Sequence, residues 1–154
     1  MHNRLELSAD WLHEALRRLA LPQHHFAVPV ALGFKLQVTL DPAAIRLAGS
    51  TLTVPLAVHP GPTVPVRLTF TEFTPPWLWW RCEEVTVAGV TLPAARLLHQ
   101  ALTRALPTPD TVRQAGPMLG LDLDAALAPR WPARVLECTV HDGLLLAWQL
   151  PLSQ

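Results

Sequence analysis

Cysteine, histidine and paired glutamates are the side chains of this chain whose types could support catalysis. Cys138 and His141 have the chemistry of a nucleophile and its base, but they lie three positions apart in a segment that reads as a strand. Side chains at that spacing point to opposite faces of a strand, so the two are not expected to form a dyad. Glu83 and Glu84 are neighbours and diverge for the same reason. We therefore expect a protein that is not an enzyme.

The sequence also lacks the patterns that bind metals and cofactors. His24 and His25 are adjacent, and the chain has no CxxC, HExxH or GxSxG motif, no glycine-rich phosphate loop and no dinucleotide fingerprint. We expect no metal and no cofactor. Cys82 and Cys138 are expected to be reduced, buried thiols, because two cysteines cannot form a disulfide scaffold.

Composition limits the class of protein further. The 154 residues are 50% hydrophobic and 16% charged, which predicts one folded domain spanning residues 1–154. Twelve basic and 12 acidic residues give a net charge of zero without any basic run, so nucleic acid is not an expected partner. The chain has neither a signal-peptide pattern nor an apolar stretch of about 18 residues, which predicts a cytoplasmic protein without a transmembrane segment.

The stretch TPPWLWWRCEE, residues 74–84, contains three of the six tryptophans. On a strand, Leu78, Trp80 and Cys82 share one face, and Trp77 and Trp79 share the other. The first set matches a core face. The sequence therefore predicts that Trp80 is buried and that Trp77 and Trp79 lie at the edge of an apolar groove or an interface.

The residues after this stretch indicate a change of phase. Val85 and Val87 would point away from the core if the strand continued unbroken, so a β-bulge or strand break is predicted between Cys82 and Val85. Two interpretations of Trp77 and Trp79 stay open. Either another part of the chain or a partner subunit covers them, with stacking of Arg81 on Trp79 as a further form of cover, or they border a ligand.

Strict alternation of apolar and polar residues is the clearest structural signal. Every even position from Phe26 to Leu40 is apolar, which predicts one long curved strand with a bend near Gly33 or an irregular start near Pro29. The same alternation over residues 51–59 and 64–70 predicts a hairpin. The expected core face comprises the even residues of three ranges: Phe34 to Leu40, Leu52 to Val58, and Val64 to Phe70.

Further signals complete the expected elements. The Asp-Gly pair at 142–143 predicts a hairpin that ends the fold, and amphipathic spacing predicts helices from Ala9 and from Ala94. Shorter elements are expected as a strand over Ile45–Ala48, a helix from Thr111 to about Leu119 capped by Asp110, and a turn of helix capped by Asp122 or Asp124. The predicted fold class is α+β, with a strongly curved, predominantly antiparallel sheet packed against amphipathic helices.

The order of these elements resembles a known superfamily. The segments EEVTVAGVTLPAARLLHQAL, GLDLDAAL and VHDGLLLAW, after a helix and long one-faced strands, are similar in arrangement to the tubular lipid-binding superfamily and its small bacterial phospholipid-binding relatives. The resemblance implies a bent sheet that wraps a long helix and leaves an apolar groove for lipid. The groove residues implied in this chain are Phe34, Leu36, Leu98 and Leu102, together with Trp77 and Trp79.

Two functions follow as hypotheses. The first is non-enzymatic binding of a lipid, an acyl chain or another apolar small molecule between the curved sheet and the helix. The alternative is a structural or protein-interaction module that forms a homo-oligomer through exposed tryptophans and an edge strand.

Overall fold

The computed structural model describes residues 3–19, 23–29, 33–59, 61–87, 89–105, 109–128 and 130–151. The fold is α+β, and every pair of neighbouring strands in its sheets is antiparallel. The strands are β1 (Asn3–Ser8), β2 (His24–Pro29), β3 (Lys35–Leu40), β4 (Arg46–Ala48), β5 (Thr51–His59), β6 (Thr63–Thr74), β7 (Trp77–Cys82), β8 (Val85–Val87), β9 (Val90–Leu92), β10 (Val112–Ala115), β11 (Met118–Asp122), β12 (Arg134–Val140) and β13 (Gly143–Gln149). The helices are α1 (Ala9–Leu19), α2 (Ala94–Ala105) and α3 (Leu123–Leu127), with 3-10 turns η2 (Pro42–Ala44) and η3 (Pro109–Thr111).

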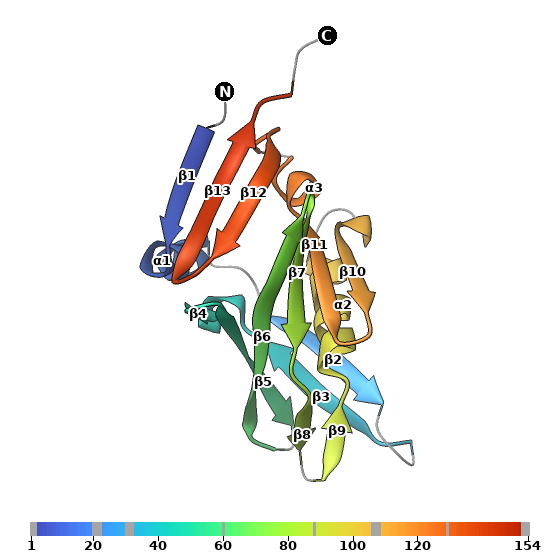
Figure 1. Ribbon diagram of the computed structural model, residues 1–154. Helices are drawn as coiled ribbons and strands as arrows, with labels where there is room; N and C mark the ends of the chain where they lie inside the picture. The colour runs from blue at the N-terminus through green and yellow to red at the C-terminus, as the bar shows by residue number, and fades with distance from the viewer. Residues whose placement is uncertain are drawn as a thin grey trace.

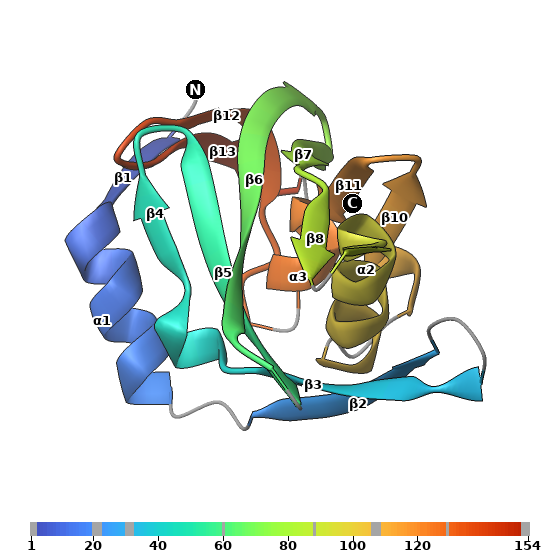
Figure 2. The same ribbon diagram turned by 90° about the horizontal axis from the view of Figure 1, so that it is seen from below.

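The largest sheet is a strongly curved half-barrel (Figures 1 and 2). Its strand order is β10-β11-β7-β6-β5-β3-β2, and β4 adds to β5 beside this path. Helix α2 lies on the concave side and contacts β10 and β11 near one end of that order and β2 at the other. Figure 2 shows this helix between the two ends of the sheet, so the half-barrel curls around α2.

The core around α2 is apolar because the strands present their even faces to it. Buried side chains from β3, β5 and β6 pack with the inner face of α2. The central members of this cluster, here called the α2 core, are Val38, Leu40, Val54, Leu56, Val66, Leu68, Leu97, Leu98 and Ala101. The predicted inward alternation is thus confirmed for these strands.

A second cluster lies between the half-barrel and the three-stranded sheet β1-β13-β12. Its buried members include Leu78, Val135, Cys138 and Leu146, with partly buried side chains of α1 and α3 packed against it. Leu52, Trp80 and Leu121 pack against both clusters, so these three side chains connect the two cores.

The long strand predicted from Phe26 to Leu40 is wrong. The structure has two strands, β2 and β3, paired as a hairpin in which Phe26 lies opposite Val38 and Val28 opposite Leu36. Both members of each pair are even-numbered, so a turn at this position leaves the alternation of the sequence unchanged. Residues 30–32 of the predicted strand lie outside the described residues.

Phe34 corrects the predicted core face. Its side chain is 69% exposed, whereas the even residues from Val38 onward in β3 are buried. Phe34 precedes β3 and has no strand partner, because the last paired positions are Pro29 and Lys35.

The helix predicted from Thr111 to about Leu119 is also wrong. After η3 the chain forms the β10–β11 hairpin, with Val112 opposite Leu121, and Gly116 takes a positive φ of 60° in its turn. The edge of β7 accepts β11 as its neighbour, and this long-range pairing outweighs the local helical signal of Asp110.

Several local predictions are confirmed. The Trp11 amide donates to Ser8 Oγ at 3.1 Å at the start of α1, and the Ala125 amide donates to Asp122 Oδ1 at 3.0 Å at the start of α3. The β5–β6 and β12–β13 hairpins form as expected. The predicted strand break between Cys82 and Val85 is also present, because β7 ends at Cys82 and β8 starts at Val85. The Val85 side chain is buried, as the prediction required.

Candidate functional site

Strand β7 separates its tryptophans between two faces of the half-barrel. Leu78 and Cys82 are buried on the inner face. Trp80 shares this face and packs against both cores, but it is half-buried and not fully buried as the sequence predicted. Trp77 and Trp79 are half-buried on the outer face, away from α2. The sequence parity of this stretch therefore corresponds to the inner and outer faces of the sheet.

The two outer tryptophans form an ordered surface with residues of neighbouring strands. Their ring centroids are 6.0 Å apart with an interplanar angle of 31°, and the guanidinium carbon of Arg113 on β10 lies 4.3 Å from the centroid of the Trp77 ring. This is a cation–π contact. The Trp79 ring lies over Gly120 of β11, where an added Cβ would be only 2.7 Å from Trp79 Cζ3. The glycine is what lets this ring lie flat on the sheet.

A bulge in β6 places one acidic group on the same surface. The register between β6 and β7 shifts between Phe70 and Glu72, so Phe70 lies opposite Trp80 on the inner face and Glu72 lies opposite Trp79 on the outer one. We call the outer surface formed by Glu72, Trp77, Trp79, Arg113 and Gly120 the tryptophan face.

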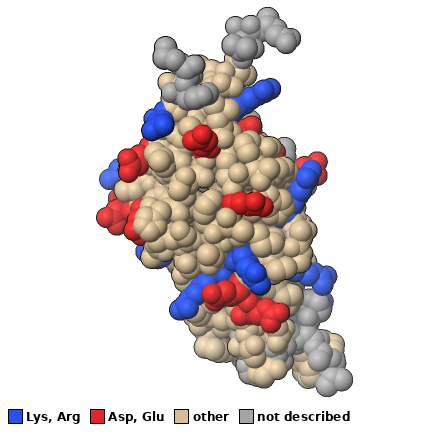
Figure 3. Space-filling model, viewed as in Figure 1, with Lys and Arg blue, Asp and Glu red and all other residues tan. Residues whose placement is uncertain are grey.

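The tryptophan face contains two charged groups of opposite sign. Glu72 and Arg113 are both exposed, and neither forms an ion pair within the described part of the chain. Figure 3 views the molecule from the side of β7 and β11, where most of the surface is uncharged and basic and acidic groups gather in the lower part. A partner would therefore meet apolar rings with Glu72 and Arg113 beside them, and with Arg81, which is exposed two residues after Trp79 on the same face of β7.

The six residues implied by the lipid-binding resemblance fall in three places. Leu98 is 3% exposed inside the α2 core, and Leu36 and Leu102 are half-buried against that core. Phe34 is exposed at the β2–β3 turn, and the two tryptophans lie on the outer face. The fold thus brings three of the six to one apolar region and separates the others from it.

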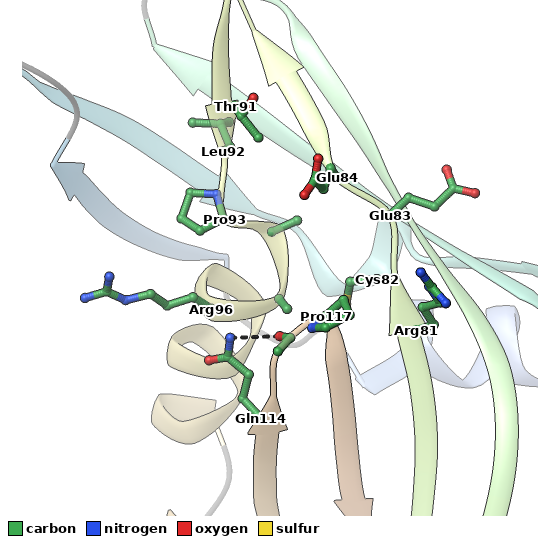
Figure 4. A pocket seen from close by; sticks show the side chains of 13 residues that line it. Arg81, Cys82, Glu83, Glu84, Thr91, Leu92, Pro93, Arg96, Gln114 and Pro117 are labelled. Carbon is green, nitrogen blue, oxygen red and sulfur yellow. Dashed lines mark hydrogen bonds between the residues drawn. The ribbon is translucent and has the colours of Figure 1, made fainter.

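The break after β7 borders a cleft of about 610 Å³ at the start of α2 (Figure 4). Its polar lining consists of Arg81, Glu83, Glu84, Thr91, Arg96 and Gln114. Figure 4 shows Arg81 and Arg96 extending toward opposite sides, and the Gln114 side chain donates to the Gly116 carbonyl at 3.2 Å. These groups diverge, so the cleft does not assemble an acid, a base and a nucleophile around one point.

The two thiols are not poised for catalysis. Burial raises the pKa of Cys82, which borders the cleft, to about 11, and burial raises the pKa of Cys138 to the same value. Both are therefore neutral, weakly nucleophilic thiols at neutral pH. Cys138 is buried while His141 is exposed, as the strand geometry predicts for this pair.

Glu14 is the one carboxylate with a strongly lowered pKa among the described residues. Hydrogen bonds from Arg17 and Arg18 on the next turn of α1 lower it to about 2. All three side chains are exposed, so this is a surface charge network on a helix and not an acid–base site.

Two kinds of feature are absent from the described residues: a cluster of metal-binding side chains and a helix that could cross a membrane. They contain no group of three or more His, Cys, Asp or Glu side chains arranged to hold a metal ion. None of the helices among them is long and apolar enough to cross a membrane.

Sequence reasoning missed the contributions of Glu72, Arg113 and Gly120 to the tryptophan face. A signal for part of it was present, because Leu119 and Leu121 alternate with Gly120 and Asp122 and mark the strand β11. Comparison with known proteins adds no relative, since no family model, no curated protein and no solved structure matches the chain.

Proposed function

We propose that the protein is a non-enzymatic binder of an apolar ligand, a lipid or acyl chain, held between α2 and the concave face of the half-barrel. One observation carries the proposal: α2 contacts strands at both ends of the curled sheet and encloses an apolar interior with them. A curved sheet closed by one helix is an arrangement in which a small movement of the helix opens apolar volume.

The side chains between α2 and the half-barrel are of types that suit an apolar ligand. Three of the buried α2 residues are alanines, Ala94, Ala95 and Ala101, so part of the helix face fills little volume. Among the described residues the buried side chains include no ionised carboxylate, Lys or Arg. An acyl chain entering this interior would leave water without meeting a charged group, and each buried methylene contributes about 0.8 kcal/mol.

Half-buried apolar residues offer an entry point. Leu36 of β3, Val64 of β6 and Leu102 of α2 pack against the margin of the α2 core and stay partly accessible to solvent. We place the ligand chain along this margin, between the C-terminal half of α2 and the strands β3 and β6.

Native mass spectrometry of freshly purified protein, combined with titration of a fluorescent fatty acid, tests the proposal. We expect co-purified lipid or acyl-chain adducts, and we expect Leu102→Gln to raise the dissociation constant of the fatty acid about tenfold, since about 1.4 kcal/mol of apolar contact is lost. Leu145→Gln is the matched control, because Leu145 is 44% exposed on β13 of the other sheet.

The result that would contradict the proposal is specific. Protein free of adducts, whose fatty-acid affinity is the same in wild type, Leu102→Gln and Leu145→Gln, would show that the α2 margin binds no apolar ligand. Far-ultraviolet circular dichroism of the three proteins checks that each is folded.

A further inference from the structure

One cross-strand row of the tryptophan face contains both of its charged groups with Trp79 and Gly120, while Trp77 lies in the next row, opposite Asp122. The strand registers place Glu72 of β6 opposite Trp79 of β7, Trp79 opposite Gly120 of β11, and Gly120 opposite Arg113 of β10. Residues that are direct partners in antiparallel strands share a face. The row therefore runs from an acid, through an aromatic ring and a glycine, to a base.

We propose that the tryptophan face binds the same face of a second copy of this chain. A two-fold axis in the interface, parallel to the strands and midway between β7 and β11, reverses the row in the partner copy. Glu72 then faces the partner's Arg113, and Arg113 faces the partner's Glu72. Such a two-fold interface uses one patch twice, as closed dimers commonly do.

The opposite signs of the two charges at the ends of this row support a second copy as the occupant. Within the described residues Glu72 and Arg113 have no ion-pair partner, although both stand beside exposed aromatic surface. A second copy supplies the complementary charge to each, and it does so twice by symmetry. It also covers Trp77 and Trp79, whose half-buried rings otherwise leave apolar area in water.

The size of the face predicts a weak, reversible dimer. Four strands at about 4.8 Å spacing and six residues at about 3.3 Å give a patch of roughly 15 by 20 Å. That is below the roughly 800 Å² per partner of a standard stable interface. The charge pairs at its border contribute mainly orientation, and salt weakens them.

A different dimer, formed by pairing the free edge of β10 with its copy, makes a contrasting prediction. Edge pairing would extend the sheet and leave the tryptophan face exposed to solvent. Its stability would not depend on Glu72, which lies three strands away from that edge.

Sedimentation velocity over a concentration series, at low and high salt and without added ligand, tests the proposal. Wild type should dimerise reversibly, and its dissociation constant should rise with salt. Glu72→Arg and Arg113→Glu should each raise that constant at least about tenfold, because each places like charges opposite one another twice. The double variant Glu72→Arg/Arg113→Glu should return it to within about threefold of wild type.

Matched controls use charges on another sheet. Arg4→Glu and Glu6→Arg reverse an exposed base and acid on β1 and should leave the dissociation constant unchanged. Trp79→Ala should abolish the dimer while the thermal midpoint of the monomer changes little. Because these samples contain no ligand, failure of the dimer leaves the apolar-ligand proposal to its own test.

Three results would overturn the inference. The first is a wild-type protein that stays monomeric up to about millimolar concentration. The second is a dimer that responds to neither single charge reversal, which would indicate edge pairing or another surface. The third is a fatty acid that quenches the outer tryptophans of a monomeric protein, which would assign the face to ligand.

Discussion

The inner and outer faces of β7 use the same residue type in different ways. On the inner face the Trp80 ring meets Phe70 edge to face, with centroids 6.0 Å apart and an interplanar angle of 73°, and it packs against both cores. On the outer face, Trp79 lies over a glycine and beside an acid. The role of a tryptophan here depends on what the neighbouring strands place opposite it, and not on its position in an aromatic run.

The largest difference between the two faces should appear when each ring is removed. Trp80→Ala should lower the free energy of unfolding by about 3 to 5 kcal/mol, because it leaves a cavity where the two cores meet. Chemical denaturation measures this loss. If Trp77→Ala costs as much as Trp80→Ala, the outer rings belong to the core and the contrast between the faces fails.

A smaller loss of stability is expected when Gly120 is replaced by a residue with a Cβ atom. Gly120→Ala should lower the free energy of unfolding by about 1 to 3 kcal/mol, because its Cβ would displace the Trp79 ring that lies 2.7 Å from it. The fluorescence of that ring should shift to longer wavelength as it enters water.

A double-mutant cycle isolates this contact. In a Trp79→Ala background the same Gly120→Ala change should cost little, since the clashing ring is absent. Equal costs in both backgrounds would show that the backbone of β11, and not the ring, requires glycine.

At neutral pH the smallest effect concerns the Cys82 thiol, which continues the inner face and acts on stability only in alkaline solution. Burial raises the pKa of the Cys82 thiol from the 9.0 of an exposed thiol to about 11 in the folded state. As pH rises above 9 the unfolded thiol ionises first, so stability should fall between pH 9 and pH 11, by at most about 1.4 kcal/mol per pH unit for each such thiol.

Cys82→Ala should reduce this loss, and Cys138→Ala should reduce it similarly because its thiol is shifted in the same direction. Urea denaturation at pH 8, 9, 10 and 11 measures it. A thiol on the outer face would ionise near its ordinary pKa, so a Cys82→Ala variant with the same pH profile as wild type would show that Cys82 is not buried on the inner face.

The sequence by itself determined the elements whose evidence is local. Alternation in residues 51–59 and 64–70 predicted β5, β6 and their inward side chains, and amphipathic spacing predicted α1 and α2. The clash of phase at Glu83 predicted the end of β7. Each of these follows from the fixed geometry of a strand or helix, in which spacing along the chain sets the direction of every side chain.

Only the tertiary structure decided which strands pair, and with what offset. The β2–β3 turn was invisible because even residues pair with even ones, and β11 became a strand because the edge of β7 accepts it. The row from Glu72 to Arg113 joins four strands, and a bulge sets its register. Such pairings are decided by contacts between segments that are far apart in the chain. Alternative pairings differ in the free energy of the whole sheet, and the preferred one produces no periodic pattern in the sequence.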